Sequence, residues 1–220
     1  MVEDKLLIEL KDISFGYYTA PDLLDDLNFR LTMGERVGII GPNGCGKTTL
    51  LYLIMGLLKP AKGEIRIFGK KRRVEEDFVE VRQRIGFLFQ NSDDQLFCPS
   101  VKEEIAFGPL NFGVERNRVR EIIDKTLKDV GLDGFEERAP YNLSGGEKRK
   151  LALATILAMQ PDVLLLDEPT IGLDEATVEK LINILNEPRL SYIIISQNRG
   201  FLKETVKRLY TVRNRRLEEL

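Results

Sequence analysis

Histidine is absent from the 220-residue sequence. This absence excludes Ser-His hydrolases, His-ligated zinc sites and imidazole acid–base catalysis. Cysteine is scarce, since the chain has Cys45 and Cys98 alone, and their spacing fits no metal site and gives little reason to expect a disulfide. We interpret Cys45 as a small residue that fills a loop rather than as a nucleophile.

The sequence also lacks long apolar runs and an excess of charge. No run approaches the roughly 18 apolar residues of a membrane-spanning helix, and residues 1–11 do not have the layout of a signal peptide. We therefore expect a cytoplasmic chain that does not itself cross a membrane. The net charge of −2, from 33 basic and 35 acidic residues, predicts no general attraction to nucleic acid. A hydrophobic content of 43% suffices for the core of one α/β domain.

The most informative motif is the glycine-rich stretch at residues 41–48, Gly-Pro-Asn-Gly-Cys-Gly-Lys-Thr. It lies between an apolar run at 37–40 and a helix-like segment at 50–58, which is the strand, loop and helix context of a phosphate-binding loop. The glycines allow the backbone to curl so that successive N–H groups point at phosphate oxygens, and the helix adds its positive end. An ordinary Gly-rich turn is the alternative, and this context disfavours it.

Lys47 and Thr48 complete the loop chemically. Lys47 can reach β- and γ-phosphates, and the Thr48 hydroxyl is suited to ligate the magnesium ion that bridges them. The motif therefore predicts a site for a nucleoside triphosphate with Mg²⁺, in which Lys47 also serves catalysis. The expected phosphate-binding residues are Gly41, Pro42, Asn43, Gly44, Cys45, Gly46, Lys47, Thr48 and Thr49.

Hydrophobic periodicity predicts an α/β chain with two kinds of sheet. Short β-type segments near the start, with a turn at 19–22, favour an antiparallel β-layer. Continuous apolar runs later in the chain suit parallel strands that helices cover on both faces. The expected strands of the first kind are 6–10, 13–17 and 27–31, and those of the second kind are 37–40, 85–89, 163–166 and 192–195.

The middle of the chain has a different pattern. Residues 91–142 are helix-forming, and the segment 119–130 has helical apolar spacing with Gly131 as a stop signal. We interpret this region as an inserted α-helical subdomain. Residues 1–90 and 143–220 then form the α/β core with its antiparallel layer, and 1–220 is a single domain.

Two carboxylates follow a buried strand. Asp167 and Glu168 come directly after the apolar run 163–166, so both emerge at the carboxyl edge of the sheet, where ligands of open α/β sheets bind. Phosphoryl transfer needs such groups, Asp167 to hold magnesium and Glu168 to orient the attacking water. A plain strand end before a Glu-Pro turn is the alternative for this pair alone.

Leu143-Ser144-Gly145-Gly146-Glu147 has a structural explanation, because Ser144 and Glu147 have the spacing of a capping box. The motif also suits phosphate binding, since two glycines at a helix start expose N–H groups and the Ser144 hydroxyl adds a donor. Both explanations stand together.

These motifs, in this order, resemble the ATP-binding cassette (ABC) ATPases over nearly the whole chain: the phosphate loop, Gln90, residues 143–147, Leu-Leu-Leu-Asp-Glu-Pro at 164–169 and Gly-Leu-Asp at 172–174. Residues 90–97 and 106–113 further resemble the energy-coupling-factor importers, which take up vitamins and transition-metal ions. The resemblance implies a P-loop NTPase cassette that binds ATP and Mg²⁺ and energises transport at the cytoplasmic face of the cell membrane.

The resemblance also implies roles for single residues. Tyr17 matches the aromatic residue that stacks on adenine, although a core-facing strand residue is the alternative, with Tyr18 as substitute. Gln90 matches the glutamine that contacts magnesium. Ser144, Gly145, Gly146 and Glu147 match the signature that closes on the γ-phosphate bound by a second protomer, and Asp174 matches the aspartate of a loop along that interface. Two chains would sandwich two ATP molecules head to tail.

The chain departs from the family at Gln197, where members usually place a histidine that contacts the γ-phosphate. A glutamine amide can donate a hydrogen bond but cannot carry positive charge. Three explanations remain open: a degenerate subunit that pairs with an unlike, complete ATPase, which we favour; a variant that hydrolyses ATP as a homodimer; or an engineered substitution that traps ATP.

A cluster of apolar residues after Gln90 suggests a docking groove. The resemblance implies that a membrane subunit docks there, which in turn contacts a substrate-binding subunit. For any single member, a place in the small core of the lobe is the alternative. The cluster comprises Phe97, Pro99, Val101, Phe107, Pro109 and Phe112. Other classes weighed against an importer ATPase are a soluble ABC protein that acts on DNA or ribosomes and a small-molecule P-loop kinase.

Overall fold

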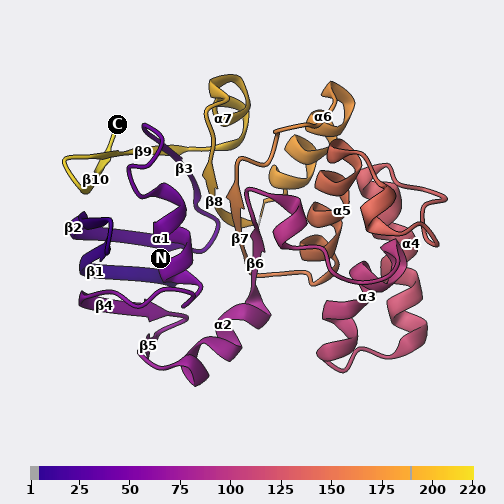
Figure 1. Cartoon of the computed structure of the whole chain (residues 1–220), viewed down its shortest axis with the longest axis horizontal. Helices are drawn as coiled ribbons and strands as arrows, with labels where there is room; N and C mark the ends of the chain where they lie inside the picture. Colours follow the sequence, from indigo (N-terminus) through magenta and orange to yellow (C-terminus); the bar gives the residue numbers. More distant parts are fainter. Residues whose placement is uncertain (1–4, 189) are drawn as a thin grey trace.

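The structure is a computed structural model that describes residues 5–188 and 190–220. Within these residues the chain forms an antiparallel sheet, a mainly parallel sheet and two groups of helices, in layers that follow one another along the long axis of the molecule (Figure 1). The α/β architecture predicted from the sequence is confirmed.

The antiparallel sheet has the strand order β2-β1-β4-β5. Its bounds are β1 (Leu6–Tyr17), β2 (Ala20–Thr32), β4 (Lys62–Ile67) and β5 (Lys70–Arg72). The sequence pattern split β1 in two because residues 11 and 12 interrupt its alternation, but the strand is continuous through a bulge at which Asp12 has φ 51°. The turn is also shorter than expected: β2 already begins at Ala20, and Pro21 and Asp22 lie within it.

The six-stranded sheet has the order β10-β9-β3-β8-β7-β6. Its strands β3, β6, β7, β8 and β9 run parallel, and β10 pairs antiparallel with β9. Their bounds are β3 (Arg36–Ile40), β6 (Ile85–Leu88), β7 (Val163–Asp167), β8 (Ser191–Ile195), β9 (Arg208–Arg213) and β10 (Arg216–Glu219). Every residue of β6, β7 and β8 is buried, as parallel strands covered on both faces require.

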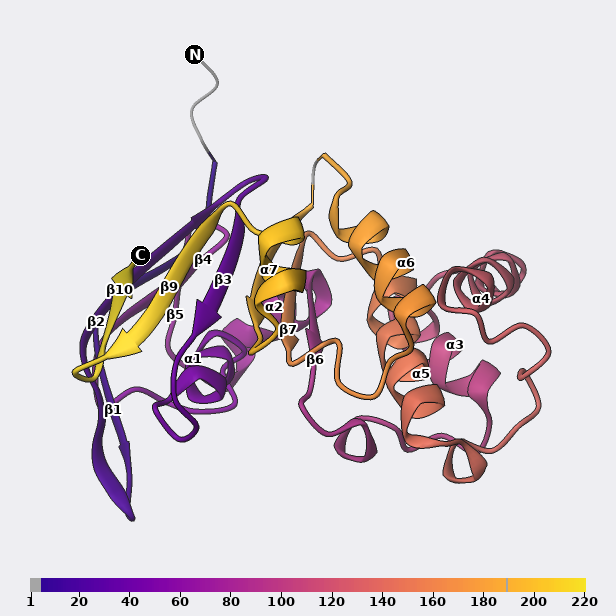
Figure 2. The ribbon, with the colours of Figure 1, turned by 90° about the horizontal axis from the view of Figure 1, so that it is seen from above.

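The helices cover both faces of this sheet. Viewed from above, α1 lies between the two sheets, while α5, α6, α3 and α4 lie on the opposite side of the parallel strands (Figure 2). The helices are α1 (Lys47–Ile54), α2 (Val79–Arg84), α3 (Val101–Asn111), α4 (Arg116–Val130), α5 (Gly145–Ala158), α6 (Glu175–Leu185) and α7 (Arg199–Thr205). Short 3₁₀ turns occupy Glu75–Phe78, Ser92–Asp94 and Pro140–Asn142. None of the helices in the described part of the chain has the length and apolarity to span a bilayer.

Three apolar clusters hold the layers together. The first joins the antiparallel sheet, α1 and one face of the parallel sheet, and the second joins the other face to α5, α6 and α7. The third joins α3 and α4 to α5 through residues such as Ile105, Leu127 and Leu151. Helix α5 therefore contributes to two clusters, and it connects the helices of residues 101–130 to the sheet. The subdomain boundaries at 90 and 142 stay a prediction.

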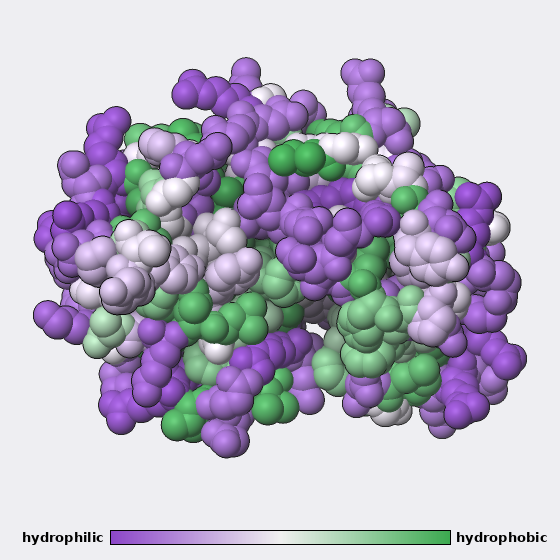
Figure 3. Space-filling view, in the orientation of Figure 1, coloured by the Kyte–Doolittle hydropathy of each residue, from purple (hydrophilic) through white to green (hydrophobic). Residues whose placement is uncertain are grey.

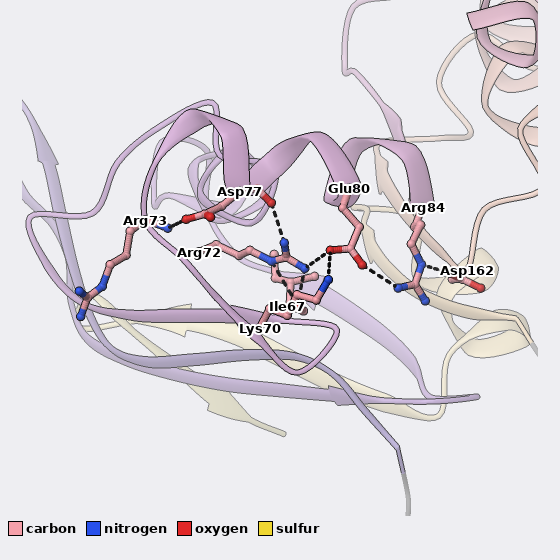
Figure 4. Close-up of polar contacts among 8 residues, drawn as sticks. All are labelled: Ile67, Lys70, Arg72, Arg73, Asp77, Glu80, Arg84 and Asp162. Atoms are coloured by element: carbon pink, nitrogen blue, oxygen red, sulfur yellow. Dashed lines mark hydrogen bonds and ion pairs between the residues drawn. The ribbon is translucent and has the colours of Figure 1, made fainter. Parts of the chain in front are cut away.

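A network of charged side chains, which we call the Glu80 network, ties β5 to α2. Arg72 is buried, and its guanidinium donates to the carbonyl oxygens of Ile67 and Asp77 and to Glu80, at 3.0 Å (Figure 4). Glu80 also accepts from Lys70 at 2.9 Å. These polar contacts add to the apolar contacts that Phe78 and Val81 make in the first cluster.

The network continues from α2 to the start of β7. Arg84 contacts Glu80 at 3.5 Å and Asp162 at 2.6 Å, and its guanidinium lies 3.7 Å above the Phe68 ring (Figure 4). Because Asp162 directly precedes β7, the network links the antiparallel layer to the parallel sheet. Single exposed ion pairs contribute little, but a shared network with a buried arginine contributes more.

We predict that Glu80→Gln lowers stability in a pH-dependent way. Hydrogen bonds from Lys70 and Arg72 lower the pKa of Glu80 from 4.5 to about 2. Since the folded chain binds this proton less tightly than the unfolded chain does, the contribution to stability is full above pH 4.5 and disappears as the pH falls towards 2.

Urea unfolding of both chains at several pH values measures this. The difference between wild type and Glu80→Gln should shrink between pH 4.5 and 2. Glu76→Gln is the matched control, because Glu76 forms no ion pair within residues 5–188 and 190–220. A gap that stays constant with pH would contradict the assignment.

Candidate functional site

The topology brings the predicted site residues to one edge of the parallel sheet. Strands β3, β6, β7 and β8 point in the same direction, so their carboxyl ends lie side by side. The phosphate loop follows β3, Gln90 follows β6, Glu168 follows β7 and Gln197 follows β8. Ligands of open α/β sheets bind at this edge.

The phosphate loop leads directly into α1. Gly46 is the N-cap with φ 103°, a left-handed conformation that glycine adopts at little cost, and α1 has no acidic residue in its first turn. The positive end of the helix therefore faces the loop with no carboxylate in its own first turn. The Lys47 ammonium lies over the loop and donates to the carbonyl oxygens of Gly41 and Pro42, each at 2.8 Å.

Thr48 and Asp167 meet at the centre of the site. The Thr48 hydroxyl donates to Asp167 Oδ2 at 2.6 Å, and Asp167 is 1% exposed. Burial raises the pKa of Asp167, while the Thr48 hydrogen bond and the charges of Arg149 and Lys47 act in the opposite direction. A hydroxyl beside a carboxylate is a donor pair that suits a hard cation such as Mg²⁺.

No cluster of three or more His, Cys, Asp or Glu that could hold a metal occurs within the described residues. Mg²⁺ is commonly held by one or two protein ligands and completes its coordination with phosphate oxygens and water. The residues present fit that mode of binding.

Glu168 adopts a left-handed backbone conformation with φ 49°, which costs free energy for a residue with a side chain. Its N–H donates to the Ile195 carbonyl at 2.8 Å, and its carboxylate accepts from the Gln197 N–H at 3.2 Å. The Gln197 side-chain amide donates in turn to the Gly41 carbonyl at 3.0 Å. Gln197 thus joins the phosphate loop to the carboxylate that follows β7.

A cavity of about 510 Å³ opens between these elements. Its lining residues come from the phosphate loop, the ends of β6 and β7, and the β1–β2 hairpin; they include Tyr17, Asn43, Gly44, Gly46, Lys47, Thr48, Thr49, Gln90, Asp167 and Glu168. A larger cavity of about 660 Å³ lies on the other side of the loop, but neither Lys47 nor the two carboxylates line it. The smaller cavity is the chemically equipped one.

Tyr17 lies on the wall of this cavity. Its ring is 38% exposed, packs edge-on against Phe15 with centroids 4.9 Å apart, and places its hydroxyl 3.3 Å from Thr49 Oγ1. Tyr18 is fully exposed and is not among the lining residues. Of the two tyrosines, Tyr17 is therefore the one placed to contact a base.

The Leu143–Glu147 motif lies outside the cavity. Ser144 and Glu147 form the predicted capping box: Ser144 Oγ accepts from the Glu147 N–H at 3.3 Å, and Glu147 Oε2 accepts from the Ser144 N–H at 2.7 Å. Ser144 and Gly145 are exposed. Within one chain, the structure does not bring this helix start and the phosphate loop together.

The two glycines of the motif differ in their surroundings. A Cβ at Gly146 would lie 2.5 Å from the Gly172 carbonyl oxygen, so the close approach of α5 to residue 172 requires glycine there. A Cβ at Gly145 would meet nothing within 4 Å in the described structure. Gly146 has a structural reason within the chain, whereas Gly145 leaves an open surface at the helix start.

Asp174 is the N-cap of α6 and also lies outside the cavity. Its carboxylate accepts from the Thr177 N–H at 2.8 Å and contacts Lys150 at 2.7 Å. These contacts hold the pKa of Asp174 well below its usual range, with Lys150 as the main cause. The pair connects the start of α6 to α5.

The sequence interpretation missed Arg149, which the structure places directly behind the site. Arg149 is 3% exposed and donates to main-chain carbonyls at the ends of β6 and β7. A signal was available, because Arg149 shares the helical spacing of the buried Ala152, Leu153 and Ile156. A charge on such a face is worth attention, since charged residues are rarely fully buried unless they are paired.

The predicted docking cluster is partly exposed. Phe97, Pro99, Phe107 and Phe112 are exposed, together with Leu110, and Figure 3 shows apolar side chains gathered over the region of α3. Val101 and Pro109 are buried, so for these two the alternative, a place inside the lobe, holds; the first turn of α3 directs Val101 into the third apolar cluster.

Glu104 fixes the loop that presents Phe97. Its carboxylate is buried and accepts from the N–H groups of Phe97 and Cys98. Burial raises the pKa of Glu104, although these two hydrogen bonds oppose the shift. A Phe97 side chain that is 68% exposed is thus held outward by a buried polar contact.

Comparison with known proteins gives consistent matches. Residues 24–171 match the family model described as ABC transporter. The energy-coupling factor transporter ATP-binding protein EcfA of Methanothermobacter thermautotrophicus is 48% identical over 82% of the chain, and its counterpart in Methanocaldococcus jannaschii is 42% identical over 94%. The chain spans 58% of the length of the first relative and 75% of the second.

Solved structures give the same picture. CbiO1 from Clostridium perfringens, part of the ABC transporter complex cbiONQ, has a TM-score of 0.82 and 29% identity, with 97% of this chain and 87% of that chain covered. The ATP-binding cassette MJ0796, dimeric and bound to ADP and Pi, has a TM-score of 0.86 and 28% identity, with 97% and 99% covered.

Proposed function

The chain belongs to the ABC transporter family, and we propose that it is the ATP-binding and ATP-hydrolysing subunit of a membrane importer of the energy-coupling-factor type, which takes up a vitamin or a transition-metal ion. The observation that carries the proposal is the cavity that holds Lys47, Thr48, Gln90, Asp167 and Glu168 together at one sheet edge. The two relatives named EcfA support the importer type.

The phosphate loop binds the triphosphate. Its N–H groups and the positive end of α1 face the phosphate oxygens, and Lys47 exchanges its loop carbonyls for the β- and γ-phosphates. Tyr17 offers its ring to the adenine from the cavity wall. When bound, Mg²⁺ neutralises charge on the phosphates; Thr48, Asp167 and Gln90 are the residues that would hold it.

Glu168 orients and polarises the attacking water. The backbone at φ 49° and the contact with the Gln197 N–H direct its carboxylate to the side of the cavity where the γ-phosphate would lie. Gln197 supplies a neutral donor at the rim of the loop, where a protonated histidine would supply charge as well.

A second chain completes the site. The start of α5, with Ser144 and the open surface at Gly145, can reach a phosphate only if it belongs to another protomer, because within one chain it lies outside the cavity. A head-to-tail dimer satisfies this for two ATP molecules at once. Asp174 and Glu147 would lie at the same interface between the two protomers. The mate is either a second copy or, as we favour from Gln197, an unlike ABC ATPase.

The membrane subunit docks at α3. The exposed Phe97, Phe107 and Phe112 provide apolar anchors beside one another, with Phe97 and Phe107 ring centroids 4.9 Å apart. A short helix of the membrane subunit would insert here and hold the chain at the cytoplasmic face of the membrane. The substrate-binding subunit would be reached only through that component.

Mixing two inactive variants tests the function and the shared site together. Lys47→Ala and Ser144→Arg should each abolish ATP hydrolysis, because every site in either homodimer carries one defect. In the mixed dimer one site carries both defects and the other is intact, so a mixture should recover about a quarter of the wild-type rate. Release of phosphate from Mg-ATP is the measurement.

The matched control mixes Lys47→Ala with Glu168→Gln. Both changes lie on the phosphate-loop side, so every mixed site is defective and no activity should return. If Lys47→Ala and Ser144→Arg also fail to complement while wild type is active, the shared site is wrong. If wild type does not bind Mg-ATP at all, the proposed function itself is wrong.

We expect Gln197→His to raise the rate. A charged donor to phosphate is about 1.4 kcal/mol stronger than a neutral one, which corresponds to ~10-fold in the rate. Because only the protonated imidazole carries charge, the gain should diminish as the pH rises above roughly 6.5. Steady-state hydrolysis across pH, alone and with an unlike ATPase added, tests this. Unchanged rates in both tests would refute the idea that Gln197 weakens the contact with the γ-phosphate.

The docking surface is tested with charged substitutions. Phe97→Asp and Phe112→Asp should leave Mg-ATP binding intact and abolish co-purification with the membrane subunit, because burying a carboxylate in an apolar contact is costly. Val74→Asp is the control, since Val74 is also exposed but lies at the β5 end of the molecule. Normal co-purification of both phenylalanine variants would exclude this surface.

A further inference from the structure

Arg149 is a buried arginine that the proposed mechanism leaves unused. It lies on α5, two positions after Glu147, and is 3% exposed. Burial lowers its pKa to about 10, while the nearby Asp167 and Glu168 carboxylates oppose the shift, so the guanidinium is charged at neutral pH. Its Nε atom has no hydrogen-bond partner in the described structure. A charge in such a place is costly unless its contacts repay the desolvation.

The contacts are four main-chain carbonyls from two strand ends. Nη1 donates to the carbonyl oxygens of Phe89 and Gln90, the latter at 3.2 Å. Nη2 donates to those of Asp167 and Glu168, the latter at 2.7 Å. One planar group therefore contacts the segment after β6 and the segment after β7 at the same time.

The position of these carbonyls explains why a side chain is needed. The β6–β7 ladder ends with the pair Leu88 and Leu166, and beyond it the two strands are no longer hydrogen-bonded to each other. Arg149 bridges them immediately after that point. The guanidinium is therefore the contact that joins the Gln90 main chain to that of Glu168, whose N–H is also held by the Ile195 carbonyl of β8 at 2.8 Å.

From this geometry we infer that Arg149 is a positioning residue, which fixes the strained Glu168 main chain relative to Gln90 and thereby directs the Glu168 carboxylate at the attacking water. The inference rests on the proposed function, because it assigns a consequence for hydrolysis. It doesn't make Arg149 a catalytic residue, since the guanidinium faces carbonyls behind the cavity and isn't among the lining residues.

Removal of the guanidinium leaves other contacts between α5 and the segment after β6. Gln95 donates to the Ala152 carbonyl at 2.9 Å and accepts from the Phe89 N–H at 3.2 Å. Lys148 contacts Asp93 at 2.6 Å. Variants at Arg149 should therefore keep the packing of α5 while losing the bridge between the strand ends.

The test compares Arg149→Lys and Arg149→Met with wild type for kcat, KM and Mg-ATP affinity. A lysine keeps the charge but cannot contact four carbonyls in one plane. We expect kcat to fall ~10-fold to 100-fold in both variants, with KM and the affinity for Mg-ATP within about threefold of wild type. A fall in kcat with nearly unchanged KM and Mg-ATP affinity is the result expected of a misdirected water rather than of weaker nucleotide binding.

Arg72→Lys and Arg72→Met are the matched controls. Arg72 is also buried and donates to main-chain carbonyls, but in the Glu80 network, away from the site (Figure 4). These variants should lower the thermal midpoint at least as much as the Arg149 variants and leave kcat of the folded protein unchanged. A parallel loss of kcat in the Arg72 controls would reduce Arg149 to a structural role.

A double-mutant cycle shows whether Arg149 acts through Glu168. In a Glu168→Gln background, single-turnover hydrolysis should not fall further when Arg149→Lys is added, because there is no carboxylate left to direct. An equal fold-loss in both backgrounds, or a kcat of Arg149→Lys within about twofold of wild type, overturns the inference.

Two outcomes separate this inference from the proposed function. A wild-type chain that does not bind Mg-ATP contradicts the proposed function. A wild-type chain that binds and hydrolyses Mg-ATP, but whose Arg149→Lys variant keeps kcat within about twofold of wild type, contradicts the positioning role alone.

Discussion

The hydrogen bond between the Thr48 hydroxyl and the buried Asp167 carboxylate is the contact on which the site depends. It joins the start of α1 to the end of β7, and so fixes the phosphate loop relative to the carboxylates. Parallel pairing of β3, β8 and β7 delivers both groups to the same edge. Without that alignment, Lys47, Gln90 and Glu168 would be separate surface features, and with it they line one cavity.

Much of this arrangement could be predicted from the sequence. The correctly predicted parts depend on local features, such as helix capping and the order of the motifs. The capping box predicted at Ser144 and Glu147 is present at the start of α5. The order of the motifs was sufficient to predict the fold, and the match to the ABC transporter family and the α/β layers confirm that prediction. The phosphate loop, Gln90 and Glu168 each follow a buried apolar strand, and such apolar runs are visible in a single sequence.

What sequence did not reveal depends on tertiary packing. The bulge that makes β1 continuous requires a partner strand, and the burial of Val101 requires α4 and α5 to pack against α3. Arg149 is one of three basic residues at 148–150. Its helical spacing places it on the buried face of α5, but the carbonyls that it contacts come from the distant strands β6 and β7, whereas its neighbours Lys148 and Lys150 form ion pairs. These features depend on contacts between residues far apart in the chain, which a single sequence does not reveal.

In a head-to-tail dimer, helix α5 would contribute to two different nucleotide sites. Its first turn would touch the nucleotide held by the neighbouring protomer, while Arg149, one turn later, braces the water-directing carboxylate of its own. In a head-to-tail dimer, binding of each nucleotide would therefore affect the Arg149 contacts at the opposite site, and thermodynamic linkage makes that effect mutual. The two reaction centres would then influence each other through α5, along which Arg149 lies five residues after Ser144, a length of about 7.5 Å.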